Sequence, residues 1–228
     1  MSSINYDDFV DNFTRADALN LGSNWICRNT YSVNSGSTIG GKIVSNRGRM
    51  YVGPASGIDA EFFAIPLVGI LLAGPLNHFC EVRIAAHTTP GGGSNKFGVG
   101  VSGTPVAVLD HTNLVTAPGG SYWCQIRGDV GPLQMVLTRV SYNQSGQMGF
   151  TDLMALGFDT YVLSDLLRLE VRYTATSTDL TVLRNGVTKA TYSDISGSRY
   201  TTGCPLLPFS MNQAGDNADY SYFHGGLL

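Results

Sequence analysis

The sequence has few charged residues and no concentration of positive charge. Asp, Glu, Lys and Arg together make up 14% of the 228 residues, against roughly 25% in typical soluble domains. The net charge is −3 and no basic stripe is present. Nucleic acid is therefore not an expected partner, because phosphate binding requires clustered Lys and Arg. Such low charge fits a neutral extracellular domain, and it equally fits a surface covered by neighbours in an assembly.

Long hydrophobic runs and targeting signals are also missing. The most apolar segment, Phe62 to Ala73, is about 12 residues long and contains Pro66 and Gly69, whereas a membrane helix needs ~20 apolar residues. We therefore expect buried core or an edge strand there, and no membrane insertion. The first residues lack a charged region followed by an apolar run, so no signal peptide is expected.

The cysteines and acidic residues form no metal-binding pattern. The four cysteines are Cys27, Cys80, Cys124 and Cys204. Their spacing gives no CxxC pair and no His at zinc-finger spacing, and without a secretion signal buried thiols are favoured over disulfides. Oxygen-rich segments at Asp216–Asp219 and around Asp7, Asp8 and Asp11 are conceivable calcium ligands. Turn chemistry explains them more simply, so no metal and no cofactor is expected.

The dominant hydrophobic period is two, which is typical of strands with one buried face. Strands are predicted at Gly48–Val52, Phe79–Ile84, Lys96–Val101, Tyr122–Arg127, Gln134–Tyr142, Arg168–Tyr173, Asp179–Leu183 and Val187–Ser193. Asn185-Gly186 predicts a tight hairpin between the last two. No long helix is convincing, although a single turn is expected at Ser164–Leu167. With 28 glycines and no linker, the chain is predicted to be one all-β, antiparallel two-sheet sandwich over residues 1–228.

Two stretches carry a family resemblance. The segment from Asp11 through Phe13 and Arg15 to Leu21-Gly22 and Trp25 resembles the opening motif DxFxRADxxxLGxxW of β-sandwich domains in bacteriophage virion proteins, notably minor tail proteins of phages of actinobacteria. The stretch Leu167–Val187 resembles a hairpin of concanavalin A-like, or laminin-G-like, jelly rolls, and the ending Asp219–Gly226 resembles their closing strand.

The resemblance implies a concanavalin A-like jelly-roll fold in which the last strand lies beside the first. It also implies a virion protein, made in the host cytoplasm, that recognises a surface and often a carbohydrate. These motifs specify fold better than function, because the same fold serves lectins, glycanases, adhesion modules and capsid proteins.

Catalytic motifs were sought and not found. Glycanases on this fold carry Glu-x-Asp-x-x-Glu on one strand, so that paired carboxylates flank the scissile bond. In this sequence Glu61, Glu81 and Glu170 are isolated, and no Gly-x-Ser-x-Gly elbow is present. The sequence therefore predicts a protein without enzymatic activity.

A candidate carbohydrate-binding face lies on the strand Tyr122–Arg127. Alternation predicts that Trp123, Gln125 and Arg127 share its polar side, with Arg139 and Asn143 of the next strand on the same face. An indole beside an amide and a guanidinium suits a sugar, which presents an apolar C–H face and hydroxyls. In the competing interpretation Trp123 packs under a loop or against another subunit.

The leading hypothesis is a non-catalytic tail or tail-tip protein that attaches to host cell-wall polysaccharide. The alternatives are a capsid decoration protein without a sugar site, and a carbohydrate-active enzyme with an unrecognised site. The expected partners are other virion proteins and further copies of the chain, with a homotrimer favoured by analogy to tail fibres and tips.

Overall fold

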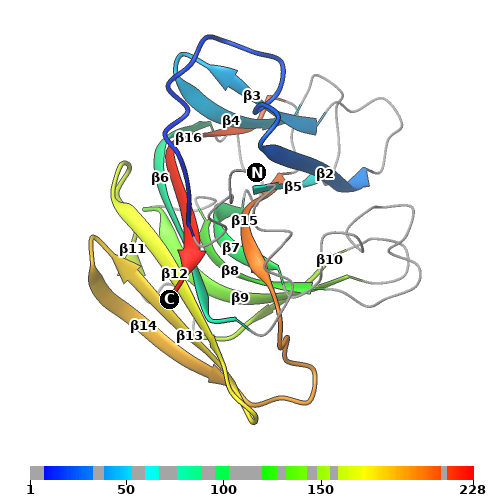
Figure 1. Ribbon diagram of the computed structural model, residues 1–228, viewed down its shortest axis with the longest axis vertical. Coiled ribbons are helices and arrows are strands. Elements are labelled where there is room, and N and C mark those ends of the chain that lie inside the picture. Colours follow the sequence, from blue (N-terminus) through cyan, green and yellow to red (C-terminus); the bar gives the residue numbers. More distant parts are fainter. Residues whose placement is uncertain are drawn as a thin grey trace, which may run out of the picture.

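The structure is a computed structural model. It describes residues 8–32, 39–52, 60–66, 76–88, 96–102, 120–127, 132–142, 148–154, 159–211 and 215–228, with side chains omitted at 26–32, 39, 60–66, 102, 142, 148 and 211. All regular structure in these residues is β-strand, arranged in two antiparallel sheets of eight strands (Figure 1). In the described part of the chain no helix is long and apolar enough to span a membrane.

The first sheet, sheet A, lies along the left and top of Figure 1. Its order is β14 (Val187–Asp194), β13 (Thr178–Arg184), β12 (Leu166–Tyr173), β6 (His78–Thr88), β16 (Asn217–Leu227), β4 (Arg47–Val52) and β3 (Ile39–Val44), with β1 (Asp8–Asp11) also beside β16. Because β1 pairs with β16, the first described strand lies beside the last, as the family resemblance implied.

The second sheet, sheet B, curves so that its outer face opens to the right of Figure 1. Its order is β10 (Met148–Asp152), β9 (Gln134–Tyr142), β8 (Gly120–Arg127), β7 (Lys96–Ser102), β15 (Cys204–Met211), β5 (Ala60–Pro66) and β2 (Trp25–Ser32), with β11 (Asp159–Thr160) beside β9. The predicted all-β, antiparallel two-sheet sandwich is confirmed.

The core lies between the sheets and follows the predicted alternation. Val82 of sheet A, Val99 of sheet B and Val171 of sheet A are fully buried, and Asn185 and Gly186 have positive φ in the turn between β13 and β14. Burying such apolar side chains stabilises a domain by about 1.5–3 kcal/mol each. The helical turn expected at Ser164–Leu167 was wrong: a tight turn with Ser164 at φ 72° leads directly into β12.

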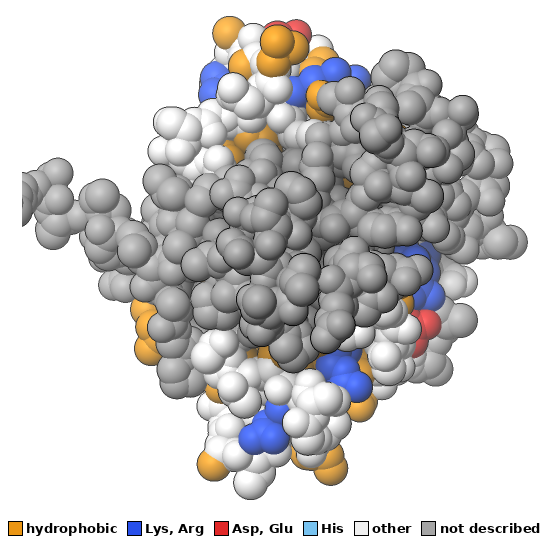
Figure 2. Space-filling model, turned by 90° about the vertical axis from the view of Figure 1, so that its right-hand side faces the viewer, with side chains coloured by type: hydrophobic (Ala, Val, Ile, Leu, Met, Phe, Trp, Pro, Cys, Tyr) orange, Lys and Arg blue, Asp and Glu red, His pale blue; other side chains and the backbone are white. Residues whose placement is uncertain are grey.

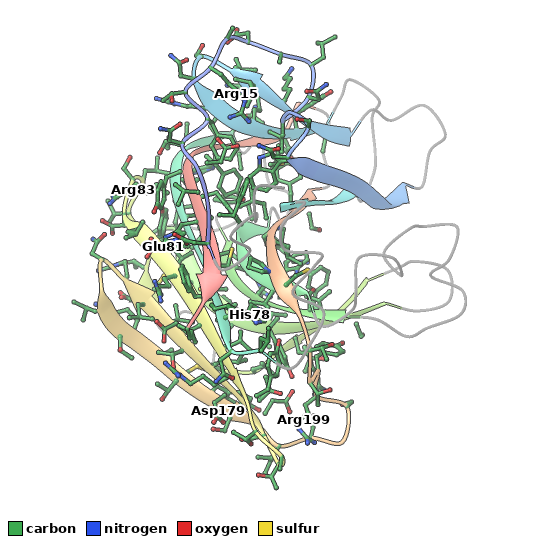
Figure 3. All side chains as sticks on the ribbon, viewed as in Figure 1. Arg15, His78, Glu81, Arg83, Asp179 and Arg199 are labelled. Atoms are coloured by element: carbon green, nitrogen blue, oxygen red, sulfur yellow. The ribbon has the colours of Figure 1, made fainter. Side chains whose placement is uncertain are left out.

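The opening motif has a structural role centred on Asp11. Its carboxylate accepts hydrogen bonds from Arg15 Nη1 at 2.7 Å and Nη2 at 2.9 Å, from Trp25 Nε1 at 2.7 Å and from Phe13 N at 2.7 Å. Burial alone would raise the pKa of Asp11, but these hydrogen bonds outweigh it and hold the pKa below 3.8. Trp25 is 7% exposed and stacks on Phe13, so it closes the core as expected. The side chains of Arg15 and Arg199 lie toward opposite ends of the sandwich, and His78 lies between them (Figure 3).

Candidate functional site

The side chains of β8 alternate between the core and the outer face of sheet B. Those in the core are Tyr122, Cys124 and Ile126. Those on the outer face are therefore Ser121, Trp123, Gln125 and Arg127. The structure thus brings together three of the five residues expected to form a binding face.

Trp123 is covered rather than exposed. Its side chain is 0% exposed, its ring meets Phe150 edge to face at a centroid distance of 5.6 Å, and its Nε1 donates to Ser121 Oγ at 2.6 Å. In this structure Trp123 therefore does not present an open sugar platform, which agrees with the competing interpretation that it packs beneath neighbouring groups.

Arg127 organises the polar groups around Trp123. Its Nη1 and Nη2 donate to the two carboxylate oxygens of Asp152, at 3.1 and 2.7 Å, and its Nε donates to Gln125 Oε1 at 3.0 Å. Thr138 Oγ1 donates to Asp152 Oδ1 at 3.1 Å. A bidentate Arg–carboxylate pair fixes both partners in one plane, so β8, β9 and β10 share one connected polar network.

A lysine and an aromatic ring extend this network. Lys96 of β7 lies directly across from Arg127, and its Nζ is 3.7 Å from the centroid of the Phe150 ring. We use the name outer-face cluster for Lys96, Trp123, Gln125, Arg127, Thr138, Phe150 and Asp152. Figure 2 shows the molecule from the right-hand side of Figure 1, and Lys and Arg side chains of described residues are visible toward its upper and lower ends.

Gln125 has an unused hydrogen-bonding group. Its side chain is 0% exposed, and Nε2 has no hydrogen-bond partner in the structure. A buried amide donor without a partner costs about 1–3 kcal/mol, and such orphan groups cluster at sites that receive a ligand or an ordered water.

Glycines on β7 make room for these side chains. Gly98 lies across from Gln125 and Gly100 across from Trp123. A Cβ at Gly98 would meet the carbonyl oxygen of Cys124 at 2.2 Å, and Gly98 has φ +148°. The floor of the outer-face cluster is thus built from positions that exclude a side chain.

The placement expected for Arg139 was wrong. Arg139 lies directly across from Tyr122, so it faces sheet A, and its Nη1 donates to Asp194 Oδ2 at 3.1 Å. Tyr122 Oη donates to the same oxygen at 2.7 Å. Burial alone would raise the pKa of Asp194, but hydrogen bonds from Ser196 and Tyr122 hold it below 3.8. Arg139 therefore joins the two sheets, whereas Asn143 lies outside the described residues.

Lys96, Phe150 and Asp152 belong to the outer-face cluster but were not predicted from the sequence to lie in a binding face. Phe150 and Asp152 belong to β10, a strand of five residues whose hydrophobic alternation is too short to stand out. The polar loop after β9 was a usable signal, because an antiparallel strand after it would place Asp152 opposite Thr138, as observed.

Three of the acidic residues considered as calcium ligands are engaged with cations or with histidine, whereas Asp7 lies outside the described residues. Asp11 pairs with Arg15, Asp219 accepts from Arg49 at 2.6 and 2.8 Å, and Asp8 contacts His224. These three carboxylates therefore belong to separate contacts.

A concavity lies beside the opening motif. It has a volume of about 300 Å³ and is lined by residues 9–11, Arg15 and residues 21–24. The polar side chains at its base are already bonded to each other, since Arg15 binds both oxygens of Asp11 and the carbonyl of Leu21. Its base therefore offers fewer unused groups than the outer-face cluster.

No family model and no curated protein matches the sequence. Solved structures do share the fold. An endo-1,3-β-glucanase from Streptomyces sioyaensis is 12% identical with a TM-score of 0.57, covering 96% of each chain. A κ-carrageenase from Pseudoalteromonas carrageenovora, in complex with an oligotetrasaccharide of κ-carrageenan, is 10% identical with a TM-score of 0.52, covering 97% of this chain and 93% of that one. SCLam, a non-specific endo-β-1,3(4)-glucanase of family GH16, is 9% identical with a TM-score of 0.51, covering 98% and 92%.

These similarities confirm the predicted concanavalin A-like jelly-roll fold. They also correct one expectation from the sequence. The prediction of a protein without enzymatic activity rested on a missing carboxylate motif, and it is contradicted by the similar structures, two endo-glucanases and a κ-carrageenase that match over nearly their whole length and point to a possible glycoside hydrolase. A missing motif excludes one arrangement of carboxylates and leaves other arrangements open.

Proposed function

We propose that this protein is a carbohydrate-active protein that binds a polysaccharide across the outer face of sheet B. The observation that carries this proposal is the outer-face cluster, with the buried, unpartnered amide nitrogen of Gln125 at its centre. Sugar oxygens are suitable acceptors for such a donor, and the face of an aromatic ring such as that of Phe150 suits the C–H groups of a pyranose ring.

The similar structures support the ligand class. The κ-carrageenase was solved with an oligosaccharide bound, and the other two proteins are named for activity on β-glucans. A polysaccharide is therefore the class of ligand with which to begin.

A direct test uses binding to laminarin, mixed-linkage β-glucan, κ-carrageenan and purified actinobacterial cell walls. Phe150→Ala is the better variant than Trp123→Ala, because removing a fully buried Trp destabilises by about 3–5 kcal/mol. We expect Phe150→Ala to weaken binding about fivefold to tenfold.

The matched control for that variant is Tyr51→Ala. Tyr51 of sheet A also lies under a lysine, with Lys42 Nζ at 4.3 Å from its ring centroid. The control should bind like the unmodified protein. If no polysaccharide in the panel binds, or if both variants lose binding equally, the proposal is wrong.

Hydrolysis of that polysaccharide is the second candidate, favoured by the glycanase activity named for the similar structures. Glycosidases use two carboxyl groups about 5–9.5 Å apart. Among the described side chains of the outer face, Asp152 is the one carboxylate, and it is held by Arg127 and Thr138.

Release of reducing sugar from the bound polysaccharide tests this candidate. Asp152→Asn should reduce turnover at least 100-fold if Asp152 reacts. Asp17→Asn is the control and should leave turnover unchanged. The Asp17 carboxylate accepts from Ser45 N in the turn between β3 and β4, away from the outer-face cluster. Absence of turnover on every polymer that binds would remove the hydrolase candidate and leave the binding proposal intact.

A location on a virion is a further proposal, supported by the opening motif. We propose a tail or capsid-surface protein that assembles with other virion proteins and with copies of itself, as a trimer. Mass spectrometry of purified particles and light scattering of the isolated protein test location and copy number separately. A monomer at micromolar concentration would contradict the trimer.

A further inference from the structure

The concavity beside the opening motif has a bonded base and an open rim. Its volume of about 300 Å³ lies at the lower end of the range for small-molecule sites, and Arg15 at its base lies toward the upper end of the sandwich (Figure 3). We use the name motif pocket for this concavity, which is lined by residues 9–11, Arg15 and residues 21–24. Most of these residues belong to the opening motif, so the motif shapes a cavity as well as closing the core.

The rim of the motif pocket carries two accessible polar side chains. Ser23 and Asn24 are both exposed, and in the described part of the chain neither side chain has a hydrogen-bond partner. A hydroxyl and a primary amide can each donate and accept. Ser23 and Asn24 can therefore bond to the hydroxyl groups of a ligand in either direction, and a ligand reaches them from solvent, unlike the buried amide of Gln125.

Arg15 adds two donors to the motif pocket. A guanidinium has five N–H groups, and Arg15 uses three of them, two on the carboxylate of Asp11 and one on the carbonyl of Leu21. The N–H of Nε and the second N–H of Nη1 are left over. A Cβ at Gly22 would lie 3.7 Å from Nη2 and 3.9 Å from Nε, so the missing side chain of Gly22 leaves room beside this edge. The Arg15 side chain is 38% exposed, which keeps both donors within reach of a ligand.

The charges of the motif pocket cancel, and part of its wall is apolar. Asp11 and Arg15 are the charged residues that line it, and they bind each other through two parallel hydrogen bonds. The carboxylate repels a free anion as strongly as the guanidinium attracts it, so the pocket has little preference for charge. Val10 is 52% exposed and Phe9 is half-buried, which provides a surface for C–H groups.

These features fit one class of ligand. We propose that the motif pocket is a second binding site, one that takes a single neutral sugar ring. The hydroxyls of such a ring both donate and accept, as the rim groups do, its C–H groups suit the apolar wall, and its size suits a small pocket.

The motif pocket is separate from the outer-face cluster. Asn24 is followed directly by Trp25, the first residue of β2, and β2 is three strands from β7 in sheet B. At the usual strand spacing this is about 14 Å. The second site therefore goes beyond the function proposed above, and it stands whether or not sheet B binds a polysaccharide.

The two tryptophans of the chain report on the two sites separately. Trp25 Nε1 donates to Asp11 at the base of the motif pocket, at 2.7 Å, whereas Trp123 belongs to the outer-face cluster. Two-dimensional NMR spectra of the isotope-labelled protein follow both indole N–H resonances while glucose, galactose, rhamnose or N-acetylglucosamine is added. We expect at least one of these sugars to shift the Trp25 resonance in a saturable way. The methyl glycoside of that sugar distinguishes the end of a glycan, which it resembles, from a free monosaccharide.

Two variants locate the effect at the rim. Asn24→Ala should weaken sugar binding about fivefold and Ser23→Ala about threefold, because each removes a group that bonds only to the ligand. Neither side chain has a bond within the described residues, so both variants should fold normally. Ser193→Ala is the matched control: it removes the same hydroxyl from an exposed serine of β14, at the far edge of sheet A. It should leave the affinity unchanged.

The outcomes separate this proposal from the proposed function. If no sugar shifts the Trp25 resonance, or if Asn24→Ala and Ser23→Ala bind sugar as tightly as Ser193→Ala, the motif pocket is not a sugar site, whatever the polysaccharide panel shows. A larger response to sodium acetate or sodium sulfate than to every sugar also overturns it, because the ligand would then be an anion. If a sugar shifts Trp25 while no polysaccharide binds, the motif pocket stands and the proposed function of sheet B is wrong.

Discussion

The two outer faces of the sandwich show how one strand pattern serves two purposes. On sheet A, Arg168 Nε lies 2.9 Å from Glu170 and Nη1 lies 3.8 Å from Glu81, while His224 Nδ1 lies 3.8 Å from Glu81. Arg172 Nη2 lies 3.7 Å from Glu170. Donors and acceptors thus alternate in space, and each charged group lies beside a partner of opposite charge or a hydrogen-bonding partner. We use the name ion-pair ladder for Glu81, Arg168, Glu170, Arg172 and His224.

On sheet B the balance differs. In the outer-face cluster the carboxylate oxygens are bonded internally, whereas the buried amide nitrogen of Gln125 has no hydrogen-bond partner. Burial differs too: β12 alternates between buried and half-buried residues, whereas Gly120–Ile126 of β8 is buried throughout. Sheet A also holds a buried oxygen without a hydrogen-bond partner, Asp179 Oδ1, so the two faces differ in the type of unused group, an acceptor on sheet A and a donor on sheet B. This difference supports the proposal that sheet B carries the binding site.

The largest expected loss of stability comes from a substitution in the interior, between the two sheets. Arg139→Ala leaves the buried carboxylate of Asp194 without its cation and should lower the free energy of unfolding by about 3–4 kcal/mol. Urea denaturation measures the loss. Because Arg139 faces sheet A, the protein that remains folded should bind polysaccharide with unchanged affinity, and a selective loss of binding at full stability would refute this placement.

The second prediction uses His78, which is buried between the faces. Burial lowers the pKa of His78 to about 4, from 6.5. Between these values the unfolded chain takes up a proton that the folded protein does not, so the free energy of unfolding should fall as pH drops from 6.5 to 4, by about 3 kcal/mol in total. His78→Gln should remove this part of the pH dependence in urea titrations. Identical pH profiles for both proteins would contradict it.

The third prediction concerns the floor of the outer-face cluster. Gly98→Ala adds a Cβ 2.2 Å from the Cys124 carbonyl oxygen at a φ of +148°, so we expect a loss of about 2–3 kcal/mol with a parallel loss of glycan affinity. Gly186→Ala is the control, since φ is +76° with nothing within 4 Å of the added atom. It should cost about 1 kcal/mol and leave binding unchanged. Thermal unfolding of both variants compares them.

The smallest effect is expected on the ion-pair ladder. The Arg172 side chain is 54% exposed and its contact with Glu170 is 3.7 Å long, so Arg172→Ala should change stability by less than about 0.5 kcal/mol. Glycan affinity should not change either. A reduction of affinity as large as that expected for Phe150→Ala would show that sheet A, rather than sheet B, carries the site.

The sequence predicts the strands of sheet A well where their outer face contacts solvent. Arg168–Tyr173 alternates cleanly between apolar and charged residues, and the structure places the charged ones outside. The Asn185-Gly186 turn also predicts the register of the hairpin, because it places Arg184 opposite Val187, as observed.

The same reasoning fails for sheet B because both faces of its strands β8 and β9 are largely buried. On β9, Met135, Val136 and Leu137 are consecutive and all fully buried, so hydrophobicity does not say which side faces the core. The polar residue Arg139 was therefore assigned outward, although its carboxylate partner Asp194 lies on sheet A. That contact joins residues 55 positions apart, and no local pattern encodes it.

The position of β15 and β16 has a consequence for how the protein is made. β15 lies between β7 and β5 in sheet B, and β16 lies between β6 and β4 in sheet A. Both sheets therefore lack a central strand until residues 204–227 have been synthesised, and a nascent chain ending earlier exposes four unpaired strand edges. We expect such fragments to rely on chaperones, and folding of both sheets to be completed only after residues 204–227 have been synthesised.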